Sequence, residues 1–531
     1  MKRSPAILAA YLPLALGKIV CFPVQSTSGL VHGHPGSLRP EVSVYLGIRY
    51  ATPPTGDLRF AAPVEYSSND TIPGNSYVGT VGTEYPSPTK IQTEQNRTCP
   101  GADVFMPPYP DATPQFQTIM KAFLVPLGPK SEDCLYLNVW TKPEPPKLKP
   151  VLLWIHGGRF EVSGAHGPYY DGESLAADHD VVVVTINYRL NIFGFSGAPG
   201  LPQNVGLLDQ RMAVEWVHQN IKAFGGDPDR ITIFGSSAGG ASVDLYAYAW
   251  ADDPIISGII AHSGTALSFQ PNTPDLSLEA FYNASSFLGC EHEEDPGKVV
   301  ACVREKPFED VLNASFRVPD RPSLATSEPV FHPVIDGVTV FSKYLKRSAL
   351  GKFAAIPFLV TCNNHETGIY RVTSYAENVT LSDHAWNEFQ KAAFDCPSGR
   401  AARDRTAHGI PAWQSRYFGD WDNLRLYPTS GAYHASDLGM VFGTAAGISG
   451  IPNSAQENKV SSYMASAWAA FAHDPKEGLT NFGWPQYGST EKCLVGLAYE
   501  NEIHPRFFDP AEFEHGCAAL HGDTSLGTGA I

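Results

Sequence analysis

One stretch of the chain, Ile231 to Val243 (ITIFGSSAGGASV), constrains the fold more than any other. In it an apolar run breaks into a serine flanked by glycines and then continues in small residues, a pattern typical of a strand that turns sharply into a helix. The motif G-x-S-x-G fits with Ser237 at its centre, because a frame centred on Ser236 puts phenylalanine and alanine at the glycine positions. Ser237 is therefore the candidate nucleophile, on a turn that the small flanking residues permit.

Apolar runs around this motif predict a parallel sheet. Residues 151–155 (VLLWI) and 180–189 (DVVVVTINYR) are nearly continuous apolar or β-branched runs, as expected of strands buried on both faces. Apolar residues then recur with helical spacing over residues 206–224, and Gly225 and Gly226 end that helix. The alternation of strands and helices predicts an α/β fold in which helices cover both faces of a mostly parallel sheet.

Charge and motif content limit the kinds of partner. The chain has 38 basic and 54 acidic side chains, a net charge of -16, and no basic run that could follow a phosphate backbone, so we expect no nucleic acid partner. It also has no HExxH or CxxC pattern and no phosphate-binding loop. We therefore expect neither a metal nor a cofactor, and the chemistry must come from side chains.

The N-terminal residues indicate export. Residues 1–22 resemble a signal peptide, with two basic residues followed by an apolar segment too short to span a membrane, and residues 23–531 are expected to form a single domain. We expect no transmembrane segment; the oligomeric state stays open. Of nine cysteines, Cys21 lies near the expected cleavage region, which leaves an even eight for an oxidising compartment. Five N-x-S/T sequons fit a secreted glycoprotein: Asn69, Asn96, Asn283, Asn313 and Asn378.

Residues 45–63 (YLGIRYATPPTGDLRFAAP), residues 131–140 (SEDCLYLNVW) and the serine motif together resemble the type B carboxylesterase family. This is a family of α/β-hydrolases that includes fungal lipases and cholinesterases. The resemblance extends from about residue 47 to about residue 487, with the motifs in the family's order. It implies an α/β-hydrolase fold and the hydrolysis of carboxylic esters.

The resemblance also implies the partners of Ser237. Glu366, in TCNNHETG, occupies the position of the family's triad acid, and His434, in GAYHASDL, matches its histidine loop. The resulting chain order of serine, glutamate and histidine is that of α/β-hydrolases. The family usually has glycine directly after the acid, whereas this chain has Thr367. Ser263 resembles a serine that the family places behind the catalytic histidine, although it could equally be the end of a strand.

A glycine turn after residues 151–155 predicts an oxyanion hole. The sequence His156-Gly157-Gly158-Arg159 can present backbone N–H groups to a developing oxyanion, together with the amide of Ala238 after the nucleophile. We expect Gly158, Arg159 and Ala238 to be the donors. The family usually carries a small residue in place of Arg159, whose side chain could either point away and pair with Glu161 or line the substrate cleft.

The resemblance implies two disulfides, Cys99–Cys134 and Cys290–Cys302. The pairing of the other four cysteines stays open, because three combinations are possible: these are Cys362, Cys396, Cys493 and Cys517. Inside the first loop, apolar side chains at helical spacing indicate a short helix that either packs against the body or acts as a lid: Phe116, Ile119, Met120 and Phe123.

The favoured interpretation is a secreted serine hydrolase that cleaves carboxylic esters through an acyl-enzyme on Ser237. The same triad could instead pass the acyl group to an alcohol, or form or open a lactone in small-molecule biosynthesis. Loss of catalysis, with a binding or adhesion role, is disfavoured because all three triad positions are filled. The expected partner is a small ester or lactone whose identity depends on loop conformations that pattern does not determine.

Overall fold

The structure is a computed structural model that describes residues 20–74, 97–104, 106–124, 128–142, 144, 146–291, 295–321 and 328–517. Most of the signal peptide expected over residues 1–22 lies outside the described residues, and so does the sequon at Asn96. The other four sequon asparagines are described, and all of them are exposed.

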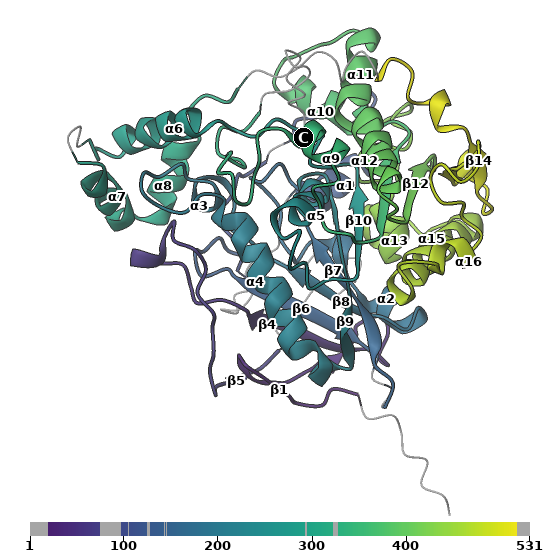
Figure 1. Cartoon of the computed structure of the whole chain (residues 1–531), viewed down its shortest axis with the longest axis horizontal. Helices are drawn as coiled ribbons and strands as arrows, with labels where there is room; N and C mark the ends of the chain where they lie inside the picture. Colours follow the sequence, from purple (N-terminus) through teal and green to yellow (C-terminus); the bar gives the residue numbers. More distant parts are fainter. Residues whose placement is uncertain are drawn as a thin grey trace, which may run out of the picture.

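A large twisted sheet forms the centre of the described part of the molecule (Figure 1). Its eleven strands lie in the order β14-β13-β12-β11-β10-β9-β7-β8-β6-β4-β3. Their bounds are β3 (His34–Pro35), β4 (Ser43–Arg49), β6 (Tyr136–Thr141), β7 (Lys149–Ile155), β8 (Val182–Ile186), β9 (Gly226–Ser236), β10 (Gly258–His262), β11 (Phe358–Asn363), β12 (Ala412–Tyr417), β13 (Leu494–Leu497) and β14 (Arg506–Phe508). A smaller sheet combines β1 (Val24–Ser26), β2 (Gly29–Val31) and β5 (Thr71–Ile72).

The strands from β8 to β13 pair in parallel, while β3, β4, β6 and β14 are antiparallel additions at the two edges. The expected mostly parallel sheet of an α/β-hydrolase is therefore present. Parallel neighbours bring their carboxyl ends to one edge, where α/β proteins place their sites.

Both faces of this sheet are buried, because successive side chains of a strand point to opposite faces. Leu152 and Trp154 of β7 belong to one apolar cluster, whereas Val151, Leu153 and Ile155 belong to another. The first cluster includes side chains of α1 (Phe116–Leu124), α2 (Glu173–Asp178), α10 (Thr367–Ala376), α11 (Asp383–Gln390), α13 (Leu438–Phe442), α14 (Ala445–Ser449), α15 (Ala455–His473) and α16 (Gly478–Asn481). The second includes side chains of α4 (Val205–Asn220), α5 (Ala238–Ala249), α9 (Tyr344–Ala349) and α12 (Cys396–Ala407).

A third apolar cluster lies in the lobe at the left of Figure 1. It is formed by α3 (Asn191–Gly194), α6 (Pro274–Phe287), α7 (Pro296–Glu305) and α8 (Phe308–Ser315). The disulfide Cys290–Cys302 ties the loop after α6 to α7. The second implied pair, Cys99–Cys134, is also present.

The structure joins Cys396 to Cys517 and leaves Cys362 and Cys493 as buried thiols. Cys362 belongs to β11 and Cys493 immediately precedes β13, with β12 between those strands. Neighbouring strands are about 4.8 Å apart, so two strand spacings exceed the roughly 7 Å over which Cα atoms can be bridged. The strand order therefore separates these two cysteines.

The helix inside the Cys99–Cys134 loop packs against the body. Phe116, Ile119 and Met120 of α1 are buried in the first apolar cluster, and Phe123 is partly buried against it. Of the two interpretations of this stripe, the structure therefore favours packing.

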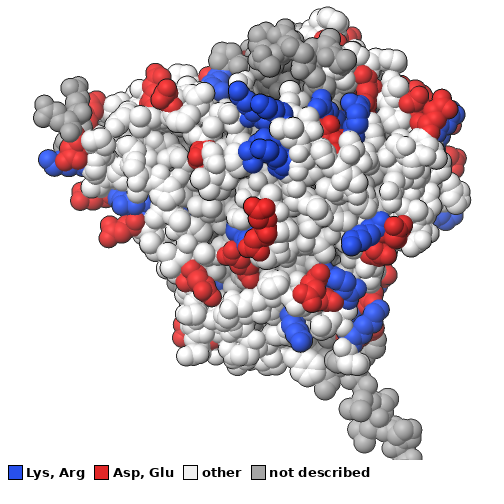
Figure 2. Space-filling model, in the orientation of Figure 1, with Lys and Arg blue, Asp and Glu red and all other residues white. Residues whose placement is uncertain are grey.

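The surface of the face in Figure 2 carries acidic and basic side chains interspersed among broad uncharged areas. None of the helices in the described ranges combines the length and the apolar composition that a membrane span requires.

Candidate active site

The candidate nucleophile lies on a strained turn between a strand and a helix. β9 ends at Ser236 and α5 begins at Ala238, so Ser237 alone makes the turn. Its backbone has φ 60° and ψ -124°, a conformation that side chains rarely adopt and that costs on the order of 1–3 kcal/mol. The surrounding structure must therefore hold Ser237 in this position.

Glycines let three backbone segments meet at this turn. A Cβ atom built on Gly239 would lie 2.1 Å from the carbonyl oxygen of Ile155 at the end of β7. A Cβ atom on Gly157 would lie 2.4 Å from the Ser236 carbonyl oxygen and 3.0 Å from Cβ of Ser237. The glycine turn after β7 is thus pressed directly against the candidate nucleophile, which is where an oxyanion hole must be.

Strand register brings the predicted residues to the same edge. His262 at the end of β10 pairs with Ser236 of β9 and with Thr361 of β11. The segments that follow these strands carry Ser237, Ser263 and Glu366. Ser263, like Ser237, has a positive φ, and its amide donates to the Thr361 carbonyl at 2.7 Å.

His434 and Glu366 form a short, buried pair. His434 Nδ1 lies 2.6 Å from Glu366 Oε2, and the side chains are 3% and 0% exposed. The His434 amide also donates to the Glu366 carbonyl oxygen at 3.3 Å. A carboxylate at Nδ1 leaves Nε2 as the nitrogen that can exchange a proton with a nucleophile.

Two further donors fix the other carboxylate oxygen of Glu366. The Ser263 hydroxyl donates to Oε1 at 2.7 Å, and the Asn363 amide donates to the same oxygen at 2.6 Å. Glu366 therefore accepts hydrogen bonds on both oxygens, which fixes the orientation of its carboxylate. Ser263 therefore contacts the carboxylate that pairs with His434.

Tyr370 completes the surroundings of the histidine, although no sequence motif singled it out. Its ring lies 5.3 Å from the His434 ring, which has Phe394 5.2 Å away. The Tyr370 hydroxyl interacts with the Ser237 hydroxyl, while His434 Nε2 is buried and has no hydrogen-bond partner among the described residues. Tyr370 follows Glu366 by one helical turn, which is the signal that could have pointed to it.

Two of the backbone N–H groups predicted to bind an oxyanion lack an acceptor in the described part of the chain. Within the described ranges, neither the Gly158 amide nor the Ala238 amide has an acceptor. Gly158 has φ 95° and Arg159 has φ 56°, so the turn is left-handed at both positions. Glycine tolerates this conformation readily, but for Arg159 it indicates strain.

Ionisable side chains lie close to Arg159, beside the oxyanion turn. Burial raises the pKa of Glu161 to about 7, an effect that the positive charge of Arg159 opposes. Burial also lowers the pKa of His332 well below its ordinary value, and the charges of Arg321 and Arg159 add to that effect. Arg321 lies 2.7 Å from Glu328 and 2.7 Å from His332 Nε2. Arg159 therefore belongs to a partly buried charged group.

Comparisons with known proteins show which family the chain resembles. The model of the carboxylesterase family matches residues 22–393 and 374–511. Chlorogenic acid esterase of Aspergillus niger is 34% identical over 507 residues, covering 93% of this chain and 88% of the relative. Secreted lipase 5 of Gibberella zeae is 32% identical over 511 residues, covering 91% of each chain. A solved PNB esterase superposes with a TM-score of 0.72 at 27% identity, covering 93% of this chain and 98% of that one.

Proposed function

The chain belongs to the carboxylesterase family and is a carboxylic ester hydrolase, and from this premise we propose that it cleaves its substrate through an acyl-enzyme on Ser237. The observation that carries the proposal is that His434, held by Glu366 at 2.6 Å, keeps a buried Nε2 with no hydrogen-bond partner among the described residues, at the sheet edge that presents Ser237. A serine hydroxyl is a weak nucleophile at neutral pH and needs such a base.

In the acylation step His434 takes the proton of Ser237 through Nε2, and Ser237 Oγ attacks the ester carbonyl carbon. Glu366 orients the ring through Nδ1 and stabilises the imidazolium. The carbonyl oxygen becomes an oxyanion that accepts hydrogen bonds from the amides of Gly158, Arg159 and Ala238. Collapse of this intermediate breaks the ester bond, and His434 gives its proton to the leaving alcohol.

In the deacylation step water replaces the alcohol. His434 removes a proton from the water, which attacks the acyl-enzyme at the same carbonyl carbon. The same backbone amides stabilise the second oxyanion. The bond to Ser237 Oγ then breaks, the serine recovers its proton from His434, and the carboxylic acid leaves.

We further propose that the enzyme is secreted and glycosylated. The apolar N-terminal segment over residues 1–22, the disulfides and the name of the Gibberella relative support secretion. Exposure of the described sequon asparagines supports glycosylation, since an acceptor must be accessible: these are Asn69, Asn283, Asn313 and Asn378.

The test uses the full chain with p-nitrophenyl esters of increasing acyl length, lactones and chlorogenic acid, the last suggested by the name of the Aspergillus relative. Ser237→Ala should lower kcat/KM by about 10⁴-fold or more, and a fluorophosphonate probe should no longer label the protein. Ser236→Ala is the matched control. Wild-type turnover by Ser237→Ala, or labelling at Ser236, would refute the assignment.

A further inference from the structure

A second buried histidine and carboxylate pair lies next to the proposed triad. His262 Nδ1, at the end of β10, is 2.7 Å from Asp437 Oδ2, and the side chains are 0% and 2% exposed. Asp437 follows His434 by three residues and immediately precedes α13. This pair takes no part in the acyl transfer described above.

The hydrogen bonds define the protonation state of His262. Trp468 Nε1 lies 2.9 Å from His262 Nε2, and an indole N–H can only donate, so Nε2 must be the acceptor. The ring proton then sits on Nδ1 and points at Asp437, which leaves His262 neutral. The rings of Trp154, Phe234 and Trp468 lie 6.2, 6.4 and 5.2 Å from the His262 ring.

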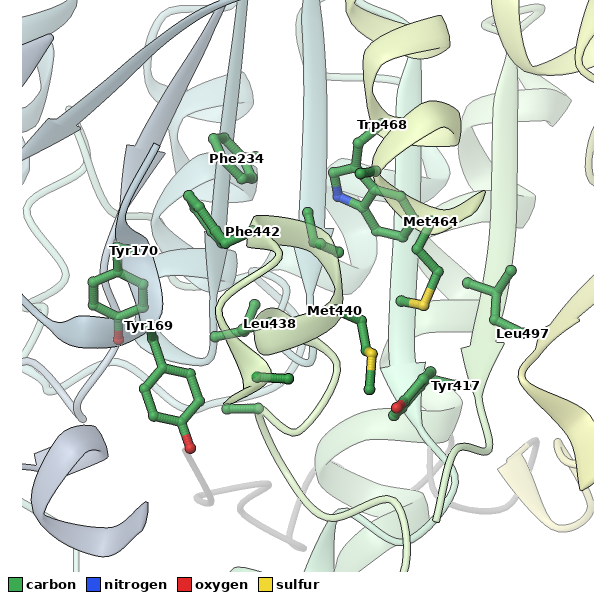
Figure 3. Close-up of a cluster of buried hydrophobic side chains, with 14 of the residues drawn as sticks. Tyr169, Tyr170, Phe234, Tyr417, Leu438, Met440, Phe442, Met464, Trp468 and Leu497 are labelled. Atoms are coloured by element: carbon green, nitrogen blue, oxygen red, sulfur yellow. The ribbon is translucent and has the colours of Figure 1, made fainter. Parts of the chain in front are cut away.

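The surroundings of this pair are apolar. Figure 3 shows Trp468 of α15 beside Met464, with Phe442 of α13 stacked near Phe234 of β9. A charge held among such side chains is weakly screened and acts strongly on its neighbours. Because His262 is neutral, the negative charge of Asp437 is balanced by hydrogen bonds and not by a cation on that histidine.

Asn363 links Asp437 to the triad acid. Its side-chain N–H donates to Asp437 Oδ1 at 3.1 Å, while its backbone N–H donates to Glu366 Oε1 at 2.6 Å. Burial raises the pKa of Asp437, whereas the hydrogen bonds from His262 and Asn363 and the charge of His434 act to lower it. Both oxygens of Asp437 therefore accept hydrogen bonds, as expected of a charged carboxylate.

Several other ionisable groups face Asp437 from the elements packed around it. They are His262 on β10, Cys362 on β11, Tyr417 on β12, and Glu366 and His434 of the triad. Of these, His434 is the group that gains a positive charge when Ser237 loses its proton.

We propose that Asp437 is a positioning residue of this esterase, whose buried charge stabilises the His434 imidazolium and whose bond to Asn363 holds Glu366 in place. The proposal rests on the triad proposed above. Asp437 touches neither substrate nor Ser237 and acts through His434 and Glu366. The neutral His262, which accepts a hydrogen bond from Trp468, shields the Asp437 carboxylate from water and fixes its orientation.

The test is the pH profile of kcat/KM for Asp437→Asn in the full chain. Loss of a nearby negative charge disfavours the imidazolium, so the acid limb should move to lower pH by about one unit. We also expect kcat to fall by about 10- to 100-fold with little change in KM, because only the transition state carries the imidazolium. Asp437→Ser, which removes the charge with a smaller side chain, should show the same shift.

The matched control is Asp437→Glu, which changes the length of the side chain but keeps its negative charge. Its acid limb should stay in place. If folded Asp437→Asn and Asp437→Ser keep the wild-type acid limb, Asp437 has only a structural role and the proposal is overturned.

Nitrogen-15 shifts of labelled histidines in the wild-type protein give an answer that does not depend on any variant folding. A neutral His262 protonated at Nδ1 supports the proposal, and a cationic His262 near pH 7 overturns it. Fluorophosphonate labelling of Ser237 in each variant separates the two proposals. If Ser237→Ala keeps full activity, the proposed function itself has failed.

Discussion

Two buried histidines at this sheet edge each contact a carboxylate through Nδ1, but they differ in what their Nε2 atoms contact. His434 lies 2.6 Å from Glu366, and His262 lies 2.7 Å from Asp437. His262 Nε2 accepts a hydrogen bond from Trp468, whereas His434 Nε2 has no partner among the described residues. A short histidine–carboxylate bond therefore does not by itself identify a catalytic base.

The two pairs differ in whether Nε2 of the histidine already accepts a hydrogen bond. A general base must accept a proton during the reaction, so a nitrogen already bonded to an indole is unavailable. An unpaired polar atom in the interior is costly, and proteins keep such atoms where function requires them. Of the two histidines, only His434 therefore has a second nitrogen that can serve as the proposed base.

The largest expected effect comes from replacing each histidine by glutamine. His434→Gln should lower kcat/KM by about 10⁴-fold or more, because it removes the proposed base. His262→Gln should instead lower the free energy of unfolding by about 1–3 kcal/mol, because buried groups lose their partners. Steady-state kinetics and urea unfolding of both variants measure these effects. Equal losses of activity in the two variants would contradict the distinction between the two histidines.

A smaller effect is expected from replacing Arg159, in the turn predicted to form the oxyanion hole. Arg159→Ala keeps the backbone donor but removes the guanidinium. If that side chain lines the cleft, kcat/KM for esters carrying a carboxylate or phenolate should fall by about 10-fold, or 1.4 kcal/mol, while small neutral esters are spared. Paired assays on acidic and neutral esters of equal size measure this difference. Equal changes on both would return Arg159 to a scaffold role.

A still smaller effect is expected from replacing Tyr370, whose ring lies against His434. Tyr370→Phe keeps the ring against His434 but removes the hydroxyl that interacts with Ser237. Loss of one hydrogen bond worth about 0.5–1.5 kcal/mol should lower kcat/KM by about 2- to 10-fold. Phe394→Leu is the comparison, because it alters ring packing on His434 without touching the serine. A fully wild-type rate in Tyr370→Phe would show that the hydroxyl contributes nothing.

The last prediction concerns Glu161, whose carboxyl group is more weakly hydrogen-bonded than that of Glu366 or Asp437. Glu161 accepts a long bond of 3.5 Å from Asn191, and burial raises its pKa to about 7. Between about pH 4.5 and 7 the unfolded chain ionises at this position while the folded chain holds the proton, so the wild type loses stability as pH rises. Glu161→Gln removes this loss.

The melting temperature of Glu161→Gln relative to wild type should therefore rise from pH 4.5 to about 7 and then level off. Thermal unfolding at several pH values measures it. A difference that stays constant over this range would mean that Glu161 ionises normally in the folded protein.

Much of the architecture could be predicted from the sequence. The continuous apolar runs indicated strands buried on both faces, and Val151 to Ile155 divide between two apolar clusters accordingly. The glycine pattern at the serine motif indicated a sharp turn, and Ser237 adopts φ 60° there. Local sterics and side-chain alternation determine such features, so a short stretch contains enough information.

The sequence by itself determined the serine frame and the alternation of strands and helices. Through family resemblance it also predicted Glu366 and His434, which lie 2.6 Å apart in the structure. Only the tertiary structure decided that Cys396 pairs with Cys517, that Tyr370 reaches Ser237, and that Trp468 closes one histidine while the other stays open. These features join residues many positions apart, so they depend on strand order and on packing across the sheet. No local sequence pattern indicates which distant side chain will hydrogen-bond to the second nitrogen of a buried histidine.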